Sequence, residues 1–164
     1  MSRVALIFIL LMLSLGAGEM HIDFKETRYI DALNEKVTRS GFISFSNDSV
    51  KIYYAPPNER EVSLKDGQIT IKSGGDVSVK EAKDEPNIAK TFTLFRALFE
   101  DDEQSLKKFF KVLEKSPKEV VLKSISSSNP ISKLTYELKE GNITKLDFLG
   151  QNGDRITIDV VQKR

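Results

Sequence analysis

The clearest periodic pattern in this chain is a helical one, over residues 87–99. Large apolar side chains recur there at Ile88, Phe92, Phe95 and Phe99, a spacing that stacks them on one face of a helix. A proline precedes the pattern and suits the first helical turn, where a backbone N–H has no partner inside the helix. The pattern predicts one amphipathic helix, which either packs on a sheet as ordinary core or covers an apolar cavity.

From residue 19 onward, most of the remaining chain alternates apolar and polar residues, as half-buried strands do. Met20, Ile22 and Phe24 give the apolar face of the first expected strand. Asp66-Gly67 is a strong hairpin signal. In all, about ten short strands are expected, and the last three cover residues 133–138, 143–149 and 155–161.

Two further segments have a different composition. Residues 31–40 are polar and are expected to form a loop or lip. A short helix is expected over residues 105–108, with Asp101 or Asp102 as its N-terminal cap.

The short turns between strands fix the architecture. Strands joined in this way must be antiparallel, and a sheet of about ten such strands twists and curls. We therefore expect a mainly β (α+β) fold, a curved antiparallel sheet forming a half-open β-barrel with a helical lid over an apolar cavity. One helix is too small to cover the combined apolar face of so many strands, so the remainder is either collapsed core or cavity.

The first eighteen residues differ from the rest of the chain. Arg3 is followed by residues 4–15, which are apolar apart from Ser14, and then by the small residues Gly16, Ala17 and Gly18. This pattern predicts a secretory signal peptide over residues 1–18 and a single domain over residues 19–164. A retained membrane anchor is the alternative, but the apolar run is shorter than the ~20 residues that span a bilayer.

Charge and cysteine content narrow the function classes. Removal of residues 1–18 takes away Arg3 alone, which leaves 24 basic and 24 acidic side chains. A neutral chain without a clustered basic surface does not favour nucleic-acid binding. The chain has no cysteine, so an exported protein of this kind depends on its core and has no lipid-bearing cysteine. We expect a monomeric protein of the bacterial periplasm.

Little in the sequence indicates catalysis or metal binding. His21 is the only histidine, and no G-x-S-x-G motif accompanies it, so a Ser-His-Asp site is not expected. Asp101-Asp102-Glu103 is more simply a solvated helix start than a metal site. We expect no enzyme activity, no metal and no cofactor.

Several short motifs resemble LolA-like outer-membrane lipoprotein carriers, and together they cover nearly the whole of residues 19–164. They are Phe24-x-Glu26-x-Arg28, Leu33, Gly41-Phe42-Ile43-x-Phe45, the turn with Pro57, residues 61–64 with Asp66-Gly67, Arg96-Ala97-Leu98-Phe99, Leu106, residues 109–112 and Asn152-Gly153-Asp154. The resemblance implies a periplasmic carrier without enzyme activity, in which an apolar trough under a helical lid holds acyl chains. It also implies an inner-membrane donor complex and an outer-membrane acceptor as partners.

The chain departs from this family at one place. Typical carriers have an Arg-Pro pair after the second strand, and the arginine holds the lid, whereas this chain has Ser46-Asn47-Asp48. We therefore expect the lid to close by packing of Phe and Leu, with polar attachment reduced or relocated. Glu26 and Arg28 are expected at the mouth of the cavity, where they either contact cargo or form a structural ion pair.

The sequence thus predicts a carrier that shields the acyl chains of a lipoprotein or another lipid-linked cargo. A sensor or interaction domain of the same fold, binding a protein through a strand edge, is one alternative, and a small hydrolase or isomerase is another. The residues expected to line the cavity and lid are Ile43, Phe45, Ile52, Tyr54, Leu64, Ile69, Ile71, Phe92, Phe95 and Phe99.

Overall fold

A computed structural model describes residues 19–164, and the expected signal peptide lies outside the described residues. Its strands are β1 Met20–Ile30, β2 Glu35–Phe45, β3 Ser49–Tyr54, β4 Arg60–Lys65, β5 Gln68–Ser73, β6 Asp76–Glu81, β7 Phe110–Lys115, β8 Glu119–Ser124, β9 Ile131–Lys139, β10 Asn142–Gly150 and β11 Arg155–Lys163. Its helices are α1 Pro86–Phe99 and α2 Glu103–Leu106, with short 3-10 turns at Asp31–Leu33 and Ala82–Asp84.

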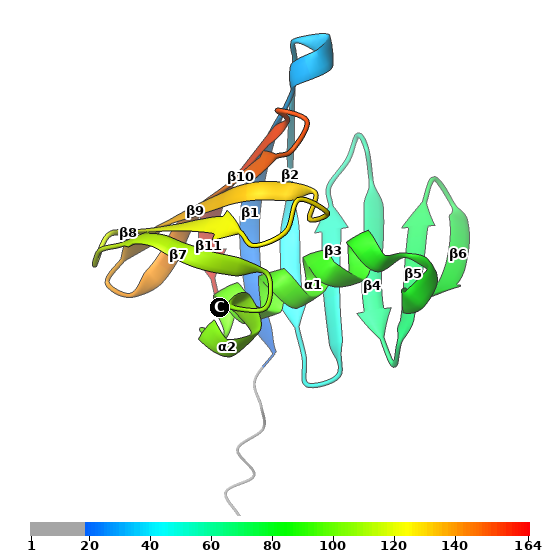
Figure 1. Cartoon of the computed structure of the whole chain (residues 1–164). Helices are drawn as coiled ribbons and strands as arrows, with labels where there is room; N and C mark the ends of the chain where they lie inside the picture. Colours follow the sequence, from blue (N-terminus) through cyan, green and yellow to red (C-terminus); the bar gives the residue numbers. More distant parts are fainter. Residues whose placement is uncertain (1–18) are drawn as a thin grey trace, which may run out of the picture.

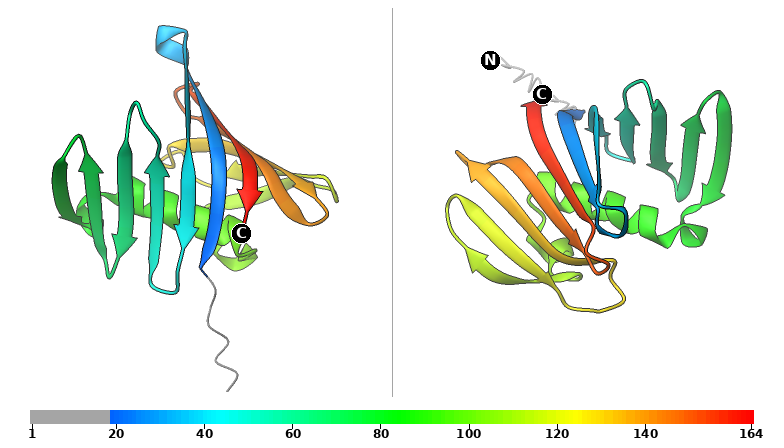
Figure 2. Two further views of the ribbon diagram at one scale, coloured as in Figure 1. Left: turned by 180° about the vertical axis from the view of Figure 1, so that it is seen from behind. Right: turned by 90° about the horizontal axis from the view of Figure 1, so that it is seen from above.

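All the strands belong to one antiparallel sheet. The spatial order is β6-β5-β4-β3-β2-β1-β11-β10-β9-β8-β7, so the first and last strands of the chain pair at its centre. Within the described residues β6 and β7 are the outermost strands, and the sheet is therefore open. Figure 2 shows that the sheet curves around α1, which lies on its concave side. The predicted mainly β fold with an open, curved antiparallel sheet is confirmed.

The long helix forms where the apolar period predicts it. Pro86 occupies its first turn, and the helix ends at Phe99. Phe92, Phe95 and Phe99 are buried, as are Leu94, Ala97 and Leu98 on adjoining faces. The buried surface of α1 is consequently wider than a single stripe, as expected of a helix that is enclosed by a curved sheet rather than laid on a flat one.

The core lies between α1 and the inner face of the sheet (Figure 1). The alternation along β1 places Ile22 and Phe24 inward, both almost fully buried. Leu134 on β9 and Leu146 on β10 come from the other half of the sheet and join the same cluster. One continuous core thus connects both halves of the open sheet, and both halves pack against α1.

The expectation of a loop over residues 31–40 is wrong for most of that segment. Only Asp31–Leu33 forms a 3-10 turn, and β2 starts at Glu35. The polar residues of β2 pair with β1 as far as the last pair, which Ile30 forms with Glu35. β1 and β2 therefore form a long hairpin whose tip projects beyond the sheet (Figure 1). Backbone pairing with β1 stabilises this extension without an apolar face of its own.

The second expected helix lies slightly earlier than predicted. It covers Glu103–Leu106 rather than residues 105–108. Its cap is Asp102, because the carboxylate of Asp102 accepts a hydrogen bond from the backbone N–H of Ser105 at 3.1 Å. Leu106 is buried in the core and attaches this short helix to the sheet.

The core location of Leu134 gives a stability prediction. Leu134 is 0% exposed, so Leu134→Ala should lower the free energy of unfolding by about 2–5 kcal/mol through lost apolar contacts and a residual cavity. Leu33→Ala is the matched control, because Leu33 is 62% exposed at the hairpin tip, and its effect should stay within about 0.5 kcal/mol. Urea denaturation measures both, and equal effects would contradict this assignment of the core.

Candidate functional site

A pocket lies between α1 and the inner face of the sheet, and we call it the inner pocket. Its volume is ≈ 490 Å³, within the range of ligand-binding cavities in proteins. Strands from both halves of the sheet contribute to it, together with the part of α1 between Asn87 and Phe95. Its lining residues are Glu26, Arg28, Ile52, Tyr54, Asn87, Thr91, Leu94, Phe95, Pro130, Ile131, Phe148, Gly150, Asn152, Asp154, Ile156 and Ile158.

The wall of the inner pocket is largely apolar. Phe95 of α1 meets Phe148 of β10 edge to face, with ring centroids 5.9 Å apart. Ile156 and Ile158 face inward from β11 because side chains two apart on a strand share a face. An apolar surface of this kind offers few hydrogen-bond partners to water.

One buried carboxylate interrupts this apolar wall. Glu26 is only 3% exposed. The hydroxyl of Tyr54 donates a hydrogen bond to its Oε2 at 2.9 Å, and Nε of Arg28 lies 3.8 Å from its Oε1. Neither Oε1 of Glu26 nor Nε of Arg28 has a hydrogen-bond partner among the described residues. Burial, together with the negative charge of Glu26 and this hydrogen bond, raises the pKa of Tyr54 well above its usual range.

A second, polar hollow adjoins the ends of strands β2 to β5, and we call it the rim hollow. Its volume is ≈ 850 Å³, larger than the inner pocket, but charged and turn residues dominate its lining, so it does not suit hydrocarbon. Those residues are Arg39, Tyr53, Pro57, Asn58, Glu59, Arg60, Glu61, Lys72, Ser73, Gly74 and Gly75. Arg39 connects the two sites, because its guanidinium carbon lies 5.5 Å from the centre of the Tyr54 ring.

An arginine joins α1 to the turn between β2 and β3, although it lies on the helix and not in the turn. One guanidinium nitrogen of Arg96 donates hydrogen bonds to the backbone carbonyls of Ser46 and Ser49, each at 2.9 Å. The other contacts the carboxylate of Glu100 at 3.1 Å, and the group lies 5.9 Å from the Phe45 ring centre. The turn that contains Ser46-Asn47-Asp48 thus accepts a polar attachment through the backbone carbonyls of Ser46 and Ser49, at its two ends.

The residues that the sequence predicted to line the cavity lie partly in the inner pocket and partly in the core. Ile52, Tyr54 and Phe95 line the inner pocket, and so do Glu26 and Arg28. The other seven lie in the core or pack on it without lining the pocket: Ile43, Phe45, Leu64, Ile69, Ile71, Phe92 and Phe99. Whether any of these residues binds a ligand stays a prediction.

The sequence interpretation missed several residues of this region. Phe148, Ile156 and Ile158 were recognisable from strand alternation, because they share a face with the buried residues of neighbouring strands. Arg39 lies inside the segment that was expected to be a loop, and the apolar period of residues 87–99 gives no signal for the bonds that Arg96 makes.

The described residues offer few groups for other chemistry. Residues 19–164 contain no cluster of three or more potential metal ligands. His21 contacts Asp23 at 3.0 Å and stacks on Phe42, on the side of the sheet away from the inner pocket. Within the same residues, no helix is long and apolar enough to cross a membrane.

Comparison with known proteins finds only distant similarity. No family model matches the sequence, and no curated protein matches it. A solved domain assigned to outer membrane lipoprotein sorting, from Vibrio parahaemolyticus, is 10% identical, with a TM-score of 0.41 over 92% of this chain and 86% of its own. A LolA superfamily protein from Nitrosomonas europaea is 8% identical, with a TM-score of 0.41 over 89% of this chain and 85% of its own.

A third similar structure is a MucA/MucB complex from Pseudomonas aeruginosa. The matched chain is 16% identical, with a TM-score of 0.46, and the match covers 89% of this chain but only 51% of that one. The LolA superfamily is also the family that the sequence motifs resemble. Because all three likenesses are distant, the function proposed below rests on the residues of this chain.

The bond between Tyr54 and Glu26 gives a testable prediction. Tyr54→Phe removes the hydroxyl that donates to a buried carboxylate, and the free energy of unfolding should fall by about 1–3 kcal/mol. Tyr29→Phe is the matched control, because the hydroxyl of Tyr29 donates to Asn34 at an exposed site and its loss should cost little. Equal losses in urea denaturation would contradict a structural role for the buried pair.

The raised pKa of Tyr54 adds a pH test of the same variant. Above about pH 10 the tyrosine of the unfolded chain loses its proton, while Tyr54 of the folded protein keeps it. The stability that the protonated Tyr54 contributes is therefore complete below that pH and declines as the pH rises above it. Tyr54→Phe should lose less stability than the wild type between pH 9.5 and 11. An unchanged slope would show that Tyr54 titrates normally.

The attachment made by Arg96 is testable on its own. Arg96→Gln cannot reach both carbonyls, so stability should fall by about 1–2 kcal/mol, and amide hydrogen exchange should rise in the last turns of α1. Lys90→Gln, exposed on the same helix, is the control. Unchanged exchange in Arg96→Gln would show that these bonds do not hold the helix.

Proposed function

We propose that this protein is a periplasmic carrier without enzyme activity, which shields the acyl chains of a lipoprotein or another lipid-linked cargo on the way to the outer membrane. The observation that carries this proposal is the inner pocket, an apolar space of ≈ 490 Å³ between a helix and a curved sheet. Each CH₂ group buried there contributes about 0.8 kcal/mol, so acyl chains are held reversibly without a charged contact.

The polar groups near the pocket agree better with binding than with catalysis. Glu26 already accepts a hydrogen bond from Tyr54 and lies near Arg28, and no histidine or cysteine lines the pocket. A general base or nucleophile would need a partner oriented toward a substrate. We therefore assign Glu26 and Arg28 to the mouth of a binding pocket.

On this proposal α1 is the lid. Asn87 and Thr91 in its first half line the inner pocket, whereas its last turns are held by Arg96 and by buried Phe99. Cargo would enter beside the first half of the helix, next to Pro130. A monomer that receives cargo from an inner-membrane donor complex and passes it to an outer-membrane acceptor would suit this arrangement.

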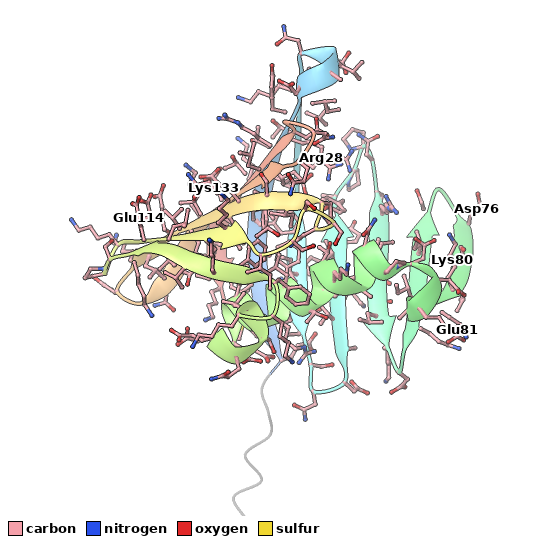
Figure 3. All side chains as sticks on the ribbon, viewed as in Figure 1. Arg28, Asp76, Lys80, Glu81, Glu114 and Lys133 are labelled. Carbon is pink, nitrogen blue, oxygen red and sulfur yellow. The ribbon has the colours of Figure 1, made fainter. Side chains whose placement is uncertain are left out.

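One observation favours a second candidate, an interaction domain that binds a protein segment along a strand edge. β6 is an outermost strand, and its Val77 and Val79 are 63% and 56% exposed. The same strand carries Asp76, Lys80 and Glu81, which Figure 3 shows along this edge of the sheet. Charged residues on an edge strand oppose unspecific pairing, so this edge is less suited to general strand addition than the pocket is to lipid.

Lipid binding tests the main proposal. The purified protein should bind a fluorescent fatty acid, and mass spectrometry should find acylated molecules in protein isolated from a periplasmic extract. Phe95→Asp places a charge in the apolar wall and should weaken binding at least tenfold. Because Phe95 is buried, Thr91→Trp at the half-buried edge of the pocket is a second variant, which should lower affinity by filling space.

The control for these variants lies on the opposite face of the sheet. Phe42→Asp changes an outward-facing, half-buried phenylalanine and should leave affinity unchanged. Circular dichroism establishes that each variant is folded. The carrier proposal is wrong if the wild type binds no fatty acid and yields no acylated molecule, or if folded Thr91→Trp binds as tightly as the wild type.

A further inference from the structure

Three arginines occupy the boundary between the inner pocket and the rim hollow. Arg39 of β2 pairs across the ladder with Glu26, Arg28 lies two residues further along β1, and Arg60 of β4 pairs with Tyr54. Arg28 lines the inner pocket, whereas Arg39 and Arg60 line the rim hollow. Figure 3 shows Arg28 on the side of the molecule where the long hairpin projects. Three strands thus bring three positive charges to one side of the apolar space.

The guanidinium groups of these arginines have few partners within the described residues: Arg39 lies over the Tyr54 ring, and Arg28 lies near Glu26. Among residues 19–164, none of the three donates a hydrogen bond. The Nε atoms of Arg28 and Arg39 are buried without a partner, and the one ion pair that the three form is the 3.8 Å contact of Arg28 with Glu26. A buried donor that lacks an acceptor is costly unless a bound group supplies one.

Most carboxylates of the two sites, in contrast, already have partners. Glu61 contacts Lys72 at 3.0 Å and Lys51 at 3.5 Å, and the carboxylate of Glu59 accepts the hydroxyl of Tyr53 at 2.9 Å. The other acid of the inner pocket, Asp154, lies beside the β1–β2 hairpin and accepts hydrogen bonds from the backbone N–H of Asp31 and the side chain of Asn152. The formal charges of the two sites balance, but the buried donors that lack an acceptor belong to arginines, Arg28 and Arg39.

We propose that the cargo is an amphiphile with an anionic head group, which Arg28, Arg39 and Arg60 bind at the rim while its chains occupy the inner pocket. The inference rests on the proposed carrier function and adds the chemical class of the head group. A guanidinium presents parallel N–H groups that match phosphate or carboxylate oxygens in pairs. The rim hollow, at ≈ 850 Å³, leaves room for a polar group larger than the anion itself.

Two lipids with the same chain test the head group. We expect 1-oleoyl lysophosphatidic acid to bind the wild type about tenfold more tightly than neutral 1-oleoylglycerol, because charge-assisted hydrogen bonds exist only with the former. The preference should weaken as salt is added. The double variant Arg39→Gln/Arg60→Gln should lose the preference and keep its affinity for 1-oleoylglycerol, which also establishes that its pocket is folded.

The matched control is Arg155→Gln. Arg155 alternates with inward-facing Ile156 on β11, so it is an exposed arginine on the outer face of the sheet. This variant has the same change of side chain and should keep the full preference for the phosphate lipid. A loss of preference in Arg155→Gln equal to that of the rim variant would overturn the assignment, because net charge alone would then explain it.

The outcomes separate this inference from the carrier proposal. If both lipids bind the wild type equally, the head-group inference is wrong and the carrier proposal stands. If neither binds, the carrier proposal fails. Inorganic phosphate is the third ligand: if it binds as tightly as lysophosphatidic acid while 1-oleoylglycerol does not bind, the arginines hold a free anion and not the head group of a lipid.

Discussion

Burial of one continuous apolar face is the constraint on which this structure depends. Eleven antiparallel strands in an open sheet present more apolar surface than a single helix can cover, and the chain meets this by bending the sheet around α1. Phe45 of β2 and Phe148 of β10 meet α1 from opposite halves of the sheet, at Phe99 and Phe95 respectively. The part of the inner face that α1 leaves uncovered is the inner pocket.

Polar residues gather where this burial ends. Glu26 follows Ile22 and Phe24 on the same face of β1, at the level where the apolar wall gives way to the rim. A carboxylate at that position remains buried because Tyr54 donates to it and Arg28 lies beside it. The transition from apolar to charged side chains therefore takes place within a few residues of one strand.

The sequence predicted correctly those elements whose local pattern of apolar residues matches the side chains that are buried in the structure. Residues 87–99 have both a helical apolar period and a proline at the start, and α1 differs from the prediction by one residue. Residues 35–40 have no regular apolar period, and they form a strand because they pair with β1, so Arg39 of the rim hollow was missed together with this strand. The role of Arg96 depends on two backbone carbonyls fifty residues away, which no local pattern records.

The position of Arg96 on the helix determines which end of α1 is attached to the sheet by side-chain hydrogen bonds. Arg96 belongs to the helix and donates to carbonyls of the turn between β2 and β3. The last turns of α1 are held there by these bonds and by buried Leu98 and Phe99. Asn87 in the first turn is exposed and borders the inner pocket. The first turns of α1, which border the inner pocket at Asn87 and Thr91, therefore have fewer attachments to the sheet than the last turns.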